Sequence, residues 1–168
     1  MSGAKGSAKE RELKDLFLEA GWFCRRAGGS GAGSNASYDL IAAKDGVIIL
    51  IELKYRDAGA DVYFDYEELF GDPEMEEVNG LTDVADYFDY DGNVHVYAAV
   101  RWKRDTTFYG FIPETLKRAG KDDDGNPKVE PEHKEWAIEL PPNGDDLNQL
   151  DVEQLDVRSP QAERYFQR

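Results

Sequence analysis

Residues 38–54 read YDLIAAKDGVIILIELK, and this stretch decides the fold. Two apolar runs flank the pair Asp45-Gly46, and an Asp-Gly pair between apolar runs is a strong signal for a two-residue hairpin turn. We therefore expect antiparallel strands at about 37–43 and 47–54. The run VIILI at 47–51 has no polar alternation, so both faces of the second strand should be covered, as in the middle of a sheet with helices on its sides.

The turn also decides which side chains face each other. With two turn residues, Asp39 is expected opposite Glu52, where directly paired Cβ atoms lie about 4.5 to 5.5 Å apart. Two carboxylates so placed should repel unless a cation lies between them, and Mg²⁺ typically takes one or two carboxylates together with water and phosphate. Lys54 lies two residues beyond Glu52 and therefore points to the same face. There its charge could stabilise the charge that develops at phosphorus during a reaction.

The residues alone leave two alternatives open. A three-residue turn with a bulge at Gly46 would place Asp39 opposite Ile51 instead. Even in the expected register, Asp39, Glu52 and Lys54 lie at strand ends, where they could form an ordinary solvated charge cluster. The hairpin therefore indicates a cation site only in combination with the surrounding sequence.

The segment before the hairpin predicts a helix and a short strand. Ser7 and Glu10 form a capping box at the start of the helix, and Gly21 ends it. Glu10 falls on the inward side of this helix, an unusual place for a charge unless something inside binds it; the capping box is the alternative explanation. A strand at 22–26 follows, and then a glycine-rich loop at 28–34 that can bring backbone amides close to an anion. The expected buried stripe of the helix consists of Leu13, Leu16, Phe17 and Ala20.

The segment after the hairpin begins with an acidic stretch. Residues 57–100 contain thirteen acids and neither Lys nor Arg, so we expect a solvated loop, a helix and then a strand. The expected domains are residues 1–120, which contain the hairpin, and 121–168, an acidic C-terminal extension packed on or trailing from the first. The other expected elements are a helix with Leu81, Val84, Ala85 and Phe88 on its apolar side, strands at 94–102 and 106–112, a short helix from Pro113 to about Gly120, a charged loop at 121–131 and an edge strand at 135–140.

The composition bounds the class of protein. The chain has 168 residues, 40% of them hydrophobic, which suits one packed core and argues against wholesale disorder. The longest apolar run, at 47–51, is far short of the roughly 20 residues that a membrane span needs. A single cysteine, Cys24, excludes an internal disulfide framework and a cysteine-rich zinc site. We therefore expect a soluble, cytoplasmic protein without a membrane partner.

The net charge of −15 argues against a nucleic-acid partner, because a polyanion repels phosphate. The charge is uneven, however, since residues 1–38 carry six basic and four acidic groups. In molar salt the Debye length falls to about 3 Å, so distant acidic charge is screened while close phosphate contacts survive. We therefore expect a protein from a salt-loving host, whose basic N-terminal end can contact DNA.

The order of these motifs resembles a known family. Tyr38-Asp39, twelve intervening residues and Glu52-Leu53-Lys54 are similar to the PD-(D/E)xK nuclease signature, with Tyr38 in place of the usual Pro. The segments KGSAKEREL at 5–13, GWFCRRAGGS at 21–30 and DLIA at 39–42 resemble archaeal Holliday junction resolvases of the Hjc type. The similarity runs from about Lys5 to Glu114 and is weakest between Arg56 and Asn79.

The resemblance implies a fold and an activity. Residues 1–120 would be the nuclease domain, and its fold would be α/β with a restriction-endonuclease-like core, in which a mixed central β-sheet is flanked by helices. The activity would be that of a homodimeric, metal-dependent endodeoxyribonuclease that nicks four-way DNA junctions symmetrically in recombination and repair. Its cofactor would be Mg²⁺, for which Mn²⁺ can substitute.

The resemblance also assigns roles residue by residue. Arg26, which precedes the small-residue loop, matches the family's arginine better than Arg25 does. The acids between 61 and 77 depart from the family, which usually has basic side chains after this strand. The implied catalytic residues are Glu10, Asp39, Glu52 and Lys54, and the implied metal ligands are Glu10, Asp39 and Glu52. The implied DNA-binding residues are Lys5, Lys9, Arg11, Arg25, Arg26 and Ser30.

Two other functions remain open. One is another PD-(D/E)xK nuclease that acts on linear or flapped DNA. The other is a catalytically silent acidic scaffold or DNA mimic, although such a protein has no reason to keep all four of the implied catalytic residues. Tyr87 and Phe88 are expected in core packing or a dimer contact, with stacking on DNA bases as the alternative.

Overall fold

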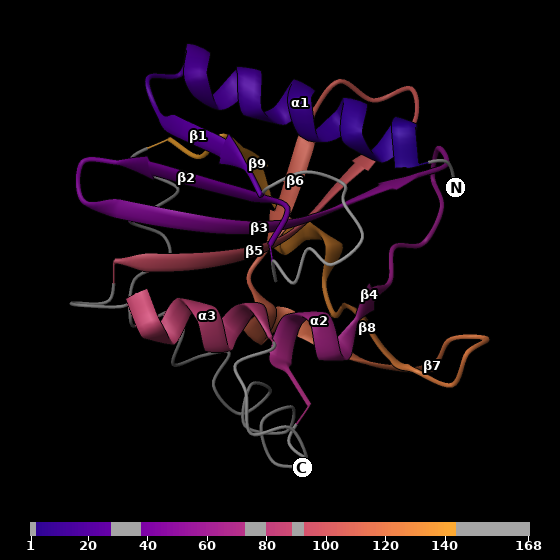
Figure 1. The fold of residues 1–168 in the computed structure, drawn as a ribbon. Coiled ribbons are helices and arrows are strands. Elements are labelled where there is room, and N and C mark those ends of the chain that lie inside the picture. Colours follow the sequence, from indigo (N-terminus) through magenta and orange to yellow (C-terminus); the bar gives the residue numbers. More distant parts are fainter. Residues whose placement is uncertain (1–2, 28–37, 73–79, 89–92, 144–168) are drawn as a thin grey trace.

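The computed structural model describes residues 3–27, 38–72, 80–88 and 93–143 (Figure 1). Within these segments the helices are α1 Gly3–Glu19, α2 Tyr66–Phe70 and α3 Leu81–Phe88. The strands are β1 Phe23–Arg26, β2 Leu40–Lys44, β3 Val47–Arg56, β4 Phe64–Asp65, β5 Val94–Trp102, β6 Phe108–Phe111, β7 Leu116–Lys121, β8 Pro127–Pro131 and β9 Ile138–Leu140. Short 3₁₀ turns lie at Pro113–Thr115 and Lys134–Trp136.

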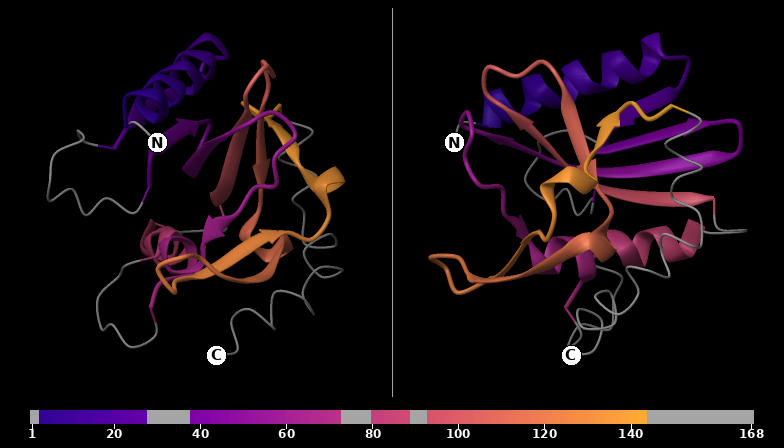
Figure 2. Two further views of the ribbon diagram at one scale, coloured as in Figure 1. Left: turned by 90° about the vertical axis from the view of Figure 1, so that its right-hand side faces the viewer. Right: turned by 180° about the vertical axis from the view of Figure 1, so that it is seen from behind.

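These strands form a larger and a smaller sheet. The larger sheet has the order β1-β2-β3-β5-β6-β9, and it is mixed because β3 and β5 run parallel while the other neighbours pair antiparallel. The smaller sheet has the order β4-β8-β7. Helix α1 covers one face of the larger sheet, and α2, α3 and the smaller sheet lie on its other face (Figure 2). The α/β architecture with a mixed, helix-flanked sheet is thus confirmed.

The β2–β3 hairpin has the predicted turn. Asp45 and Gly46 both have positive φ, 51° and 82°, as a two-residue type I′ turn requires. The ladder that follows this turn ends at the pair Leu40↔Ile51. The alternative with a three-residue turn is therefore wrong, and the register of the two strands is the expected one.

Strand β3 is covered on both faces, as its uniformly apolar sequence predicts. Leu50 packs in the cluster beneath α2 and α3, whereas Ile49 and Ile51 pack beneath α1, and all three side chains are fully buried. Strand β5 pairs with β3 along nearly its whole length. Strand β3 is therefore a rigid base for the side chains at its own carboxyl end.

Helix α1 begins earlier than the sequence indicates. It begins at Gly3, so Ser7 lies inside the helix and the predicted capping box is wrong. Residues 3–6 contain no proline, which would have stopped the helix, and they extend it beyond the local capping signal. The capping explanation for Glu10 therefore no longer applies.

The buried side of α1 is shorter than predicted. Leu13 and Phe17 are fully buried, and Leu16 packs partly buried against them. Ala20 is exposed, contrary to expectation, because the helix ends at Glu19 and the chain turns away.

Gly21 ends the helix in the predicted way. Its amide donates to the Leu18 carbonyl at 3.1 Å, and the Trp22 amide donates to the Phe17 carbonyl at 2.9 Å. These two bonds make a Schellman motif, in which the residue after the cap adopts a left-handed conformation. Gly21 has φ of 85°, and the Phe17 and Trp22 rings pack edge to face at 5.5 Å.

The acidic stretch after β3 is structured rather than a solvated loop. Residues 57–72 contain β4 and α2, and Val62, Phe64 and Leu69 from this stretch are buried. Strand β4 has two residues and helix α2 has five, so both are too short for a sequence pattern to identify them with certainty. Their burial depends on the smaller sheet and α3, which come later in the chain.

The chain between 113 and 131 also differs from expectation. The predicted short helix is a single 3₁₀ turn, and the predicted loop contains β8, which pairs antiparallel with β7. Leu116 and Val129 from these strands are fully buried. A strand of five or six residues with one or two buried positions is too short for its pattern to identify it.

The described fold continues beyond residue 120. Strand β9 pairs with β6 at the edge of the larger sheet, as predicted for residues 135–140, and β8 pairs with both β4 and β7. The expected division at residue 120 therefore coincides with no sheet boundary. The glycine-rich loop at 28–34 and most of the acidic extension, 144–168, lie outside the described residues. No helix in the described segments is long and apolar enough to cross a membrane.

Replacing Gly21 by Ala should lower the free energy of unfolding by about 1 to 2 kcal/mol, because a left-handed conformation is costly for residues with a Cβ. The added Cβ meets no atom closer than 3.6 Å, so the cost arises from the backbone. Gly21→Asn should cost less, since Asn tolerates this conformation. Urea unfolding of the three proteins measures the difference, and equal stability of all three would contradict the assignment of this cap.

Candidate active site

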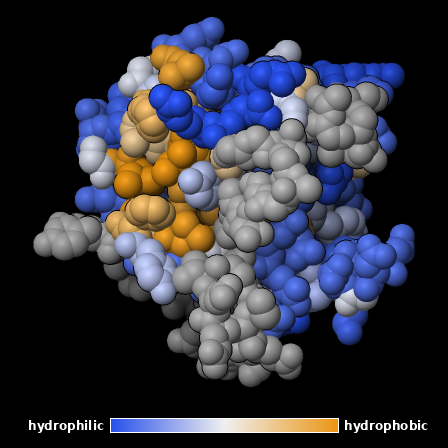
Figure 3. Space-filling model, viewed as in Figure 1, coloured by the Kyte–Doolittle hydropathy of each residue, from blue (hydrophilic) through white to orange (hydrophobic). Residues whose placement is uncertain are grey.

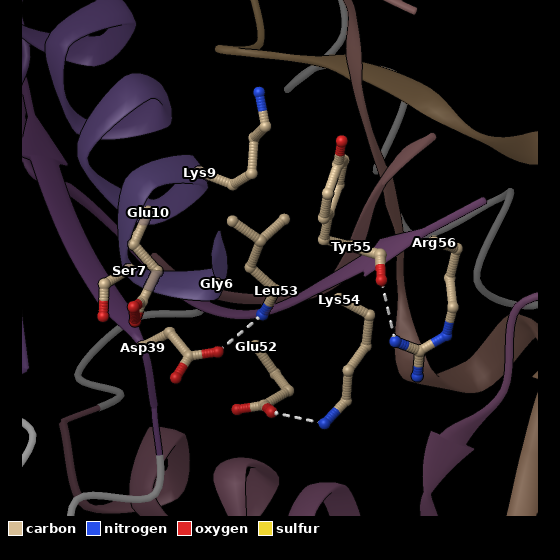
Figure 4. A pocket seen from close by; sticks show the side chains of 10 residues that line it. All are labelled: Gly6, Ser7, Lys9, Glu10, Asp39, Glu52, Leu53, Lys54, Tyr55 and Arg56. Atoms are coloured by element: carbon tan, nitrogen blue, oxygen red, sulfur yellow. Dashed lines mark hydrogen bonds and ion pairs between the residues drawn. The ribbon is translucent and has the colours of Figure 1, made fainter. Parts of the chain in front are cut away.

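A pocket of about 360 Å³ lies where the N-terminal half of α1 meets the carboxyl end of β3 (Figure 4). The acids and the lysine that the sequence singled out all reach it. In Figure 4, Asp39, Glu52 and Lys54 lie on one side of β3, and Glu10 extends toward them from α1. The lining residues are Gly6, Ser7, Lys9, Glu10, Asp39, Glu52, Leu53, Lys54, Tyr55 and Arg56.

Asp39 is held by β3 through its backbone and its side chain. Its amide donates to the Ile51 carbonyl at 2.8 Å, and its carboxylate Oδ2 accepts the Leu53 amide at 2.8 Å. The ladder therefore stops one pair before Asp39 and Glu52, because the side chain of Asp39 replaces a backbone carbonyl as the acceptor. The two carboxylates still face the same pocket, as the hairpin register predicts (Figure 4).

The lysine lies between two carboxylates. Lys54 Nζ is 3.1 Å from Glu52 Oε1 and 3.2 Å from Glu68 Oε2. Burial lowers the pKa of Lys54, but the carboxylates of Glu52 and Glu68 outweigh burial and raise this pKa above its ordinary value. Lys54 is therefore a fixed positive charge beside the two acids.

The acids of the pocket are held together against their mutual repulsion. Burial raises the pKa of Glu52 well above its ordinary value, and the neighbouring charge of Asp39 raises it further. Burial also raises the pKa of Asp39, although the Leu53 amide and Lys54 oppose this effect. For Glu10, burial and then the charge of Asp39 raise the pKa against the opposing charge of Arg26. A cation in this pocket would relieve the unfavourable charge.

Arg26 joins β1 to this cluster. Its Nη2 lies 3.4 Å from Glu10 Oε2. Its Nε is buried and has no hydrogen-bond partner among the described residues. A buried donor without a partner carries an energetic cost that a phosphate oxygen could remove.

Of the remaining residues predicted to bind DNA, some line the pocket and others do not. Lys9 lines the pocket, where its Nζ lies 2.8 Å from Glu12 Oε2 and 5.3 Å from the centre of the Tyr55 ring. Arg11 and Arg25 are exposed and do not line the pocket. Lys5 belongs to α1, and Ser30 lies outside the described residues.

Two further residues, Arg56 and Glu68, lie near the site and were not predicted from the sequence. Arg56 follows Lys54 on the same face of β3, and its guanidinium donates to the Tyr55 and Tyr63 carbonyls at 3.0 and 3.4 Å. Burial lowers the pKa of Arg56, and it has no carboxylate within ion-pair distance in the described segments. The alternation of side chains along a strand could have identified Arg56. Asp65 followed three residues later by Glu68 is a helix-start signal that could have identified α2.

The donor set of the pocket fits a hard divalent cation. In the described segments no three His, Cys, Asp or Glu side chains are gathered closely enough to form a complete protein site for a metal. Mg²⁺ does not need such a site, because one or two carboxylates suffice when water and phosphate supply the other ligands. Asp39 and Glu52 can provide those carboxylates.

A mixed sheet whose hairpin carries Asp39, Glu52 and Lys54 into one pocket defines the restriction-endonuclease-like class of folds. Residues 1–141 match the family described as "Archaeal holliday junction resolvase (hjc)", and the chain belongs to this family. Its structure is similar to that of the Hjc Holliday junction resolvase of Archaeoglobus fulgidus, with a TM-score of 0.57, 20% identity and coverage of 78% of this chain and 93% of that one. This likeness concerns the fold alone.

Two curated relatives share part of the sequence. The crossover junction endodeoxyribonuclease Hjc of Sulfolobus acidocaldarius is 39% identical over 77 residues, which are 45% of this chain and 54% of the relative. The protein of the same name from Sulfurisphaera tokodaii is 36% identical over 78 residues, which are 46% of this chain and 54% of the relative. The chain thus spans about half the length of these curated relatives.

At about pH 8 the metal-free Glu52→Gln variant should have a higher free energy of unfolding than the wild type. At about pH 5 this difference should be smaller. The raised pKa of Glu52 means that the folded wild type binds protons more tightly than the unfolded chain. The wild type therefore loses stability as the pH rises above the ordinary glutamate pKa and through the raised one. Urea unfolding in EDTA measures this, with Glu67→Gln as an exposed control; a pH-independent difference would contradict the prediction.

Proposed function

We propose that this chain is a Mg²⁺-dependent endonuclease that resolves four-way DNA junctions by paired symmetric nicks in recombination and repair. The observation that carries the proposal is the meeting of Asp39, Glu52 and Lys54 in one pocket of a chain from the Hjc family. We propose that it acts in the cytoplasm of a salt-loving host, where its acidic charge is screened.

In the proposed mechanism Asp39 and Glu52, aided by Glu10, would hold the Mg²⁺ at the pocket where the scissile phosphate binds. The bound Mg²⁺ would supply Lewis-acid stabilisation of the phosphate and lower the pKa of a water. The Leu53 amide fixes the orientation of the Asp39 carboxylate, since it donates to Oδ2. Lys54 places a positive charge beside the phosphate and stabilises the charge that develops there.

Basic side chains around the pocket would hold the neighbouring DNA. Arg26 has a buried Nε without a described partner and can bind a phosphate oxygen. Lys9 lines the pocket, and the exposed Arg11 and Arg25 extend the basic surface beyond it. Lys5 and Ser30 complete the proposed set of DNA-binding residues.

Asp39→Ala and Glu52→Ala should each abolish cleavage of a synthetic four-way junction while they retain junction binding in gel shifts. Arg26→Ala should weaken both cleavage and binding, because it removes a phosphate contact rather than a cation ligand. The assay compares a four-way junction, a flap and a linear duplex in concentrated KCl, with Mg²⁺, with Mn²⁺ and without divalent cation.

Two outcomes of these assays, and one outcome of a calorimetric titration with Mg²⁺, would contradict the proposal. Normal nicking by Glu52→Ala would refute the site. Preference for the flap or the linear duplex would favour another nuclease with the same core. Calorimetry that finds no Mg²⁺ site sensitive to Asp39→Ala would favour a silent scaffold.

We also propose that a second copy of the chain packs on an exposed apolar surface. Figure 3 shows this hydrophobic surface between α1 and α3, over the strands at that end of the larger sheet. Phe23 from β1 and Phe88 from α3 are about half exposed, and Ile41 of β2 and Val84 of α3 are partly buried against the same core cluster. A contiguous exposed apolar patch is typical of an interaction surface, and two nicks placed symmetrically need two sites related by a two-fold axis.

The double substitution of Phe23 and Phe88 by Ser should convert a dimer into a folded monomer, because it removes apolar area from the contact. Light scattering after size exclusion measures the mass, and circular dichroism checks the fold. Leu18→Ser removes a similarly exposed apolar side chain from α1 and should leave the dimer intact. A monomeric wild type, or a dimeric double variant, would contradict this surface.

A further inference from the structure

Glu68 does not line the pocket, but it contacts Lys54, and the proposed mechanism does not use this contact. Lys54 Nζ lies almost equally far from Glu52 Oε1 and Glu68 Oε2, at 3.1 and 3.2 Å. Glu52 cannot be the sole ion-pair partner of Lys54, because the proposed mechanism also requires the Glu52 carboxylate to hold a cation. Glu68 is the carboxylate that remains available to the lysine.

The helix that carries Glu68 is fixed by its own capping and packing. Asp65 caps α2, since its Oδ1 accepts the amides of Glu67 and Glu68 at 2.9 and 3.1 Å. Leu69 and Tyr66 are buried in the cluster against the larger sheet. The base of the Glu68 side chain is therefore held in one place, although its carboxylate is partly exposed.

A second observation concerns the position of α2 in the fold. The helix lies on the same face of the larger sheet as Leu50, the residue two before Glu52 in β3. Side chains two apart on a strand share a face. Glu68 of α2 thus reaches Lys54 from the layer that covers this face of the sheet. Glu10, in contrast, extends toward the acids from α1 (Figure 4).

We propose that Glu68 is a positioning residue for Lys54. It keeps the ammonium group directed into the pocket when the Glu52 carboxylate turns to the cation and gives up its share of the ion pair. Glu68 acts on the lysine and contacts neither DNA nor cation. This inference rests on the proposed function, because it gives Glu68 a task only if Lys54 acts on a phosphate.

The test compares Glu68→Gln with Glu67→Gln. Both substitutions remove one negative charge from the same helix, and Glu67 is exposed and forms no ion pair in the described part of the chain. Glu68→Gln should lower kcat on a four-way junction by about tenfold or more, because a misplaced catalytic group costs rate rather than affinity. KM and the Mg²⁺ concentration for half-maximal rate should match those of Glu67→Gln. Glu68→Asp, which keeps the charge on a shorter side chain, should have an intermediate kcat.

A readout without activity tests the contact itself. Acetylation of Lys54 by a water-soluble active ester, followed by mass spectrometry of its peptide, should be faster in metal-free Glu68→Gln than in Glu67→Gln. The ion pair with Glu68 would otherwise shield the amine. Because surface ion pairs add little stability, thermal unfolding should be the same in both variants.

The outcomes separate this inference from the proposed function. A wild type that does not cleave junctions overturns the proposed function. A wild type that cleaves, with equal kcat in Glu68→Gln and Glu67→Gln, overturns the role of Glu68 alone. A rise in the Mg²⁺ requirement specific to Glu68→Gln would make it a cation ligand and also overturn the positioning role. Unchanged acetylation of Lys54 would overturn the contact.

Discussion

The carboxylate of Asp39 accepts a hydrogen bond from the Leu53 amide just beyond the end of the β2–β3 ladder. Leu53 lies between Glu52 and Lys54, so this bond fixes the acid of one strand against the two charged residues of the other. It can do so because β3 is paired on both edges and covered on both faces. A strand with less support would move apart under the repulsion of the two acids.

The charge of the chain and the charge of the pocket follow different rules. The chain has 35 acids and 20 basic residues, which over the whole surface repel a polyanion. Within the pocket the charged groups are close together and partly buried, so individual contacts rather than the net charge decide whether a phosphate can bind. The charges of Glu52 and Asp39 repel each other, and Lys54 offsets part of that cost. Arg26 has an Nε donor without a described partner, and Arg56 donates to backbone carbonyls and has no described carboxylate partner. A phosphate with its cation matches this arrangement.

Much of the larger sheet could be predicted because its signals are local. The turn at Asp45-Gly46 and the uniformly apolar β3 identify a central hairpin, and Gly21 marks the end of α1 through its left-handed conformation. Strand β4 and the β7–β8 pair could not be predicted, and for helix α2 the sequence offers a start signal, Asp65 followed three residues later by Glu68. These elements are short, and their apolar residues are buried because distant segments of the chain cover them.

The sequence by itself determined that Glu52 and Lys54 share one face, because side chains alternate along a strand. It predicted that Asp39 joins them if the turn has two residues, and the structure decided that register. The sequence also indicated Glu10, a charge on the inward side of a helix. Only the tertiary structure decided that Glu68 reaches Lys54 and that Arg26 reaches Glu10. Those contacts join elements from different layers, and packing between layers depends on the whole chain rather than on any local pattern.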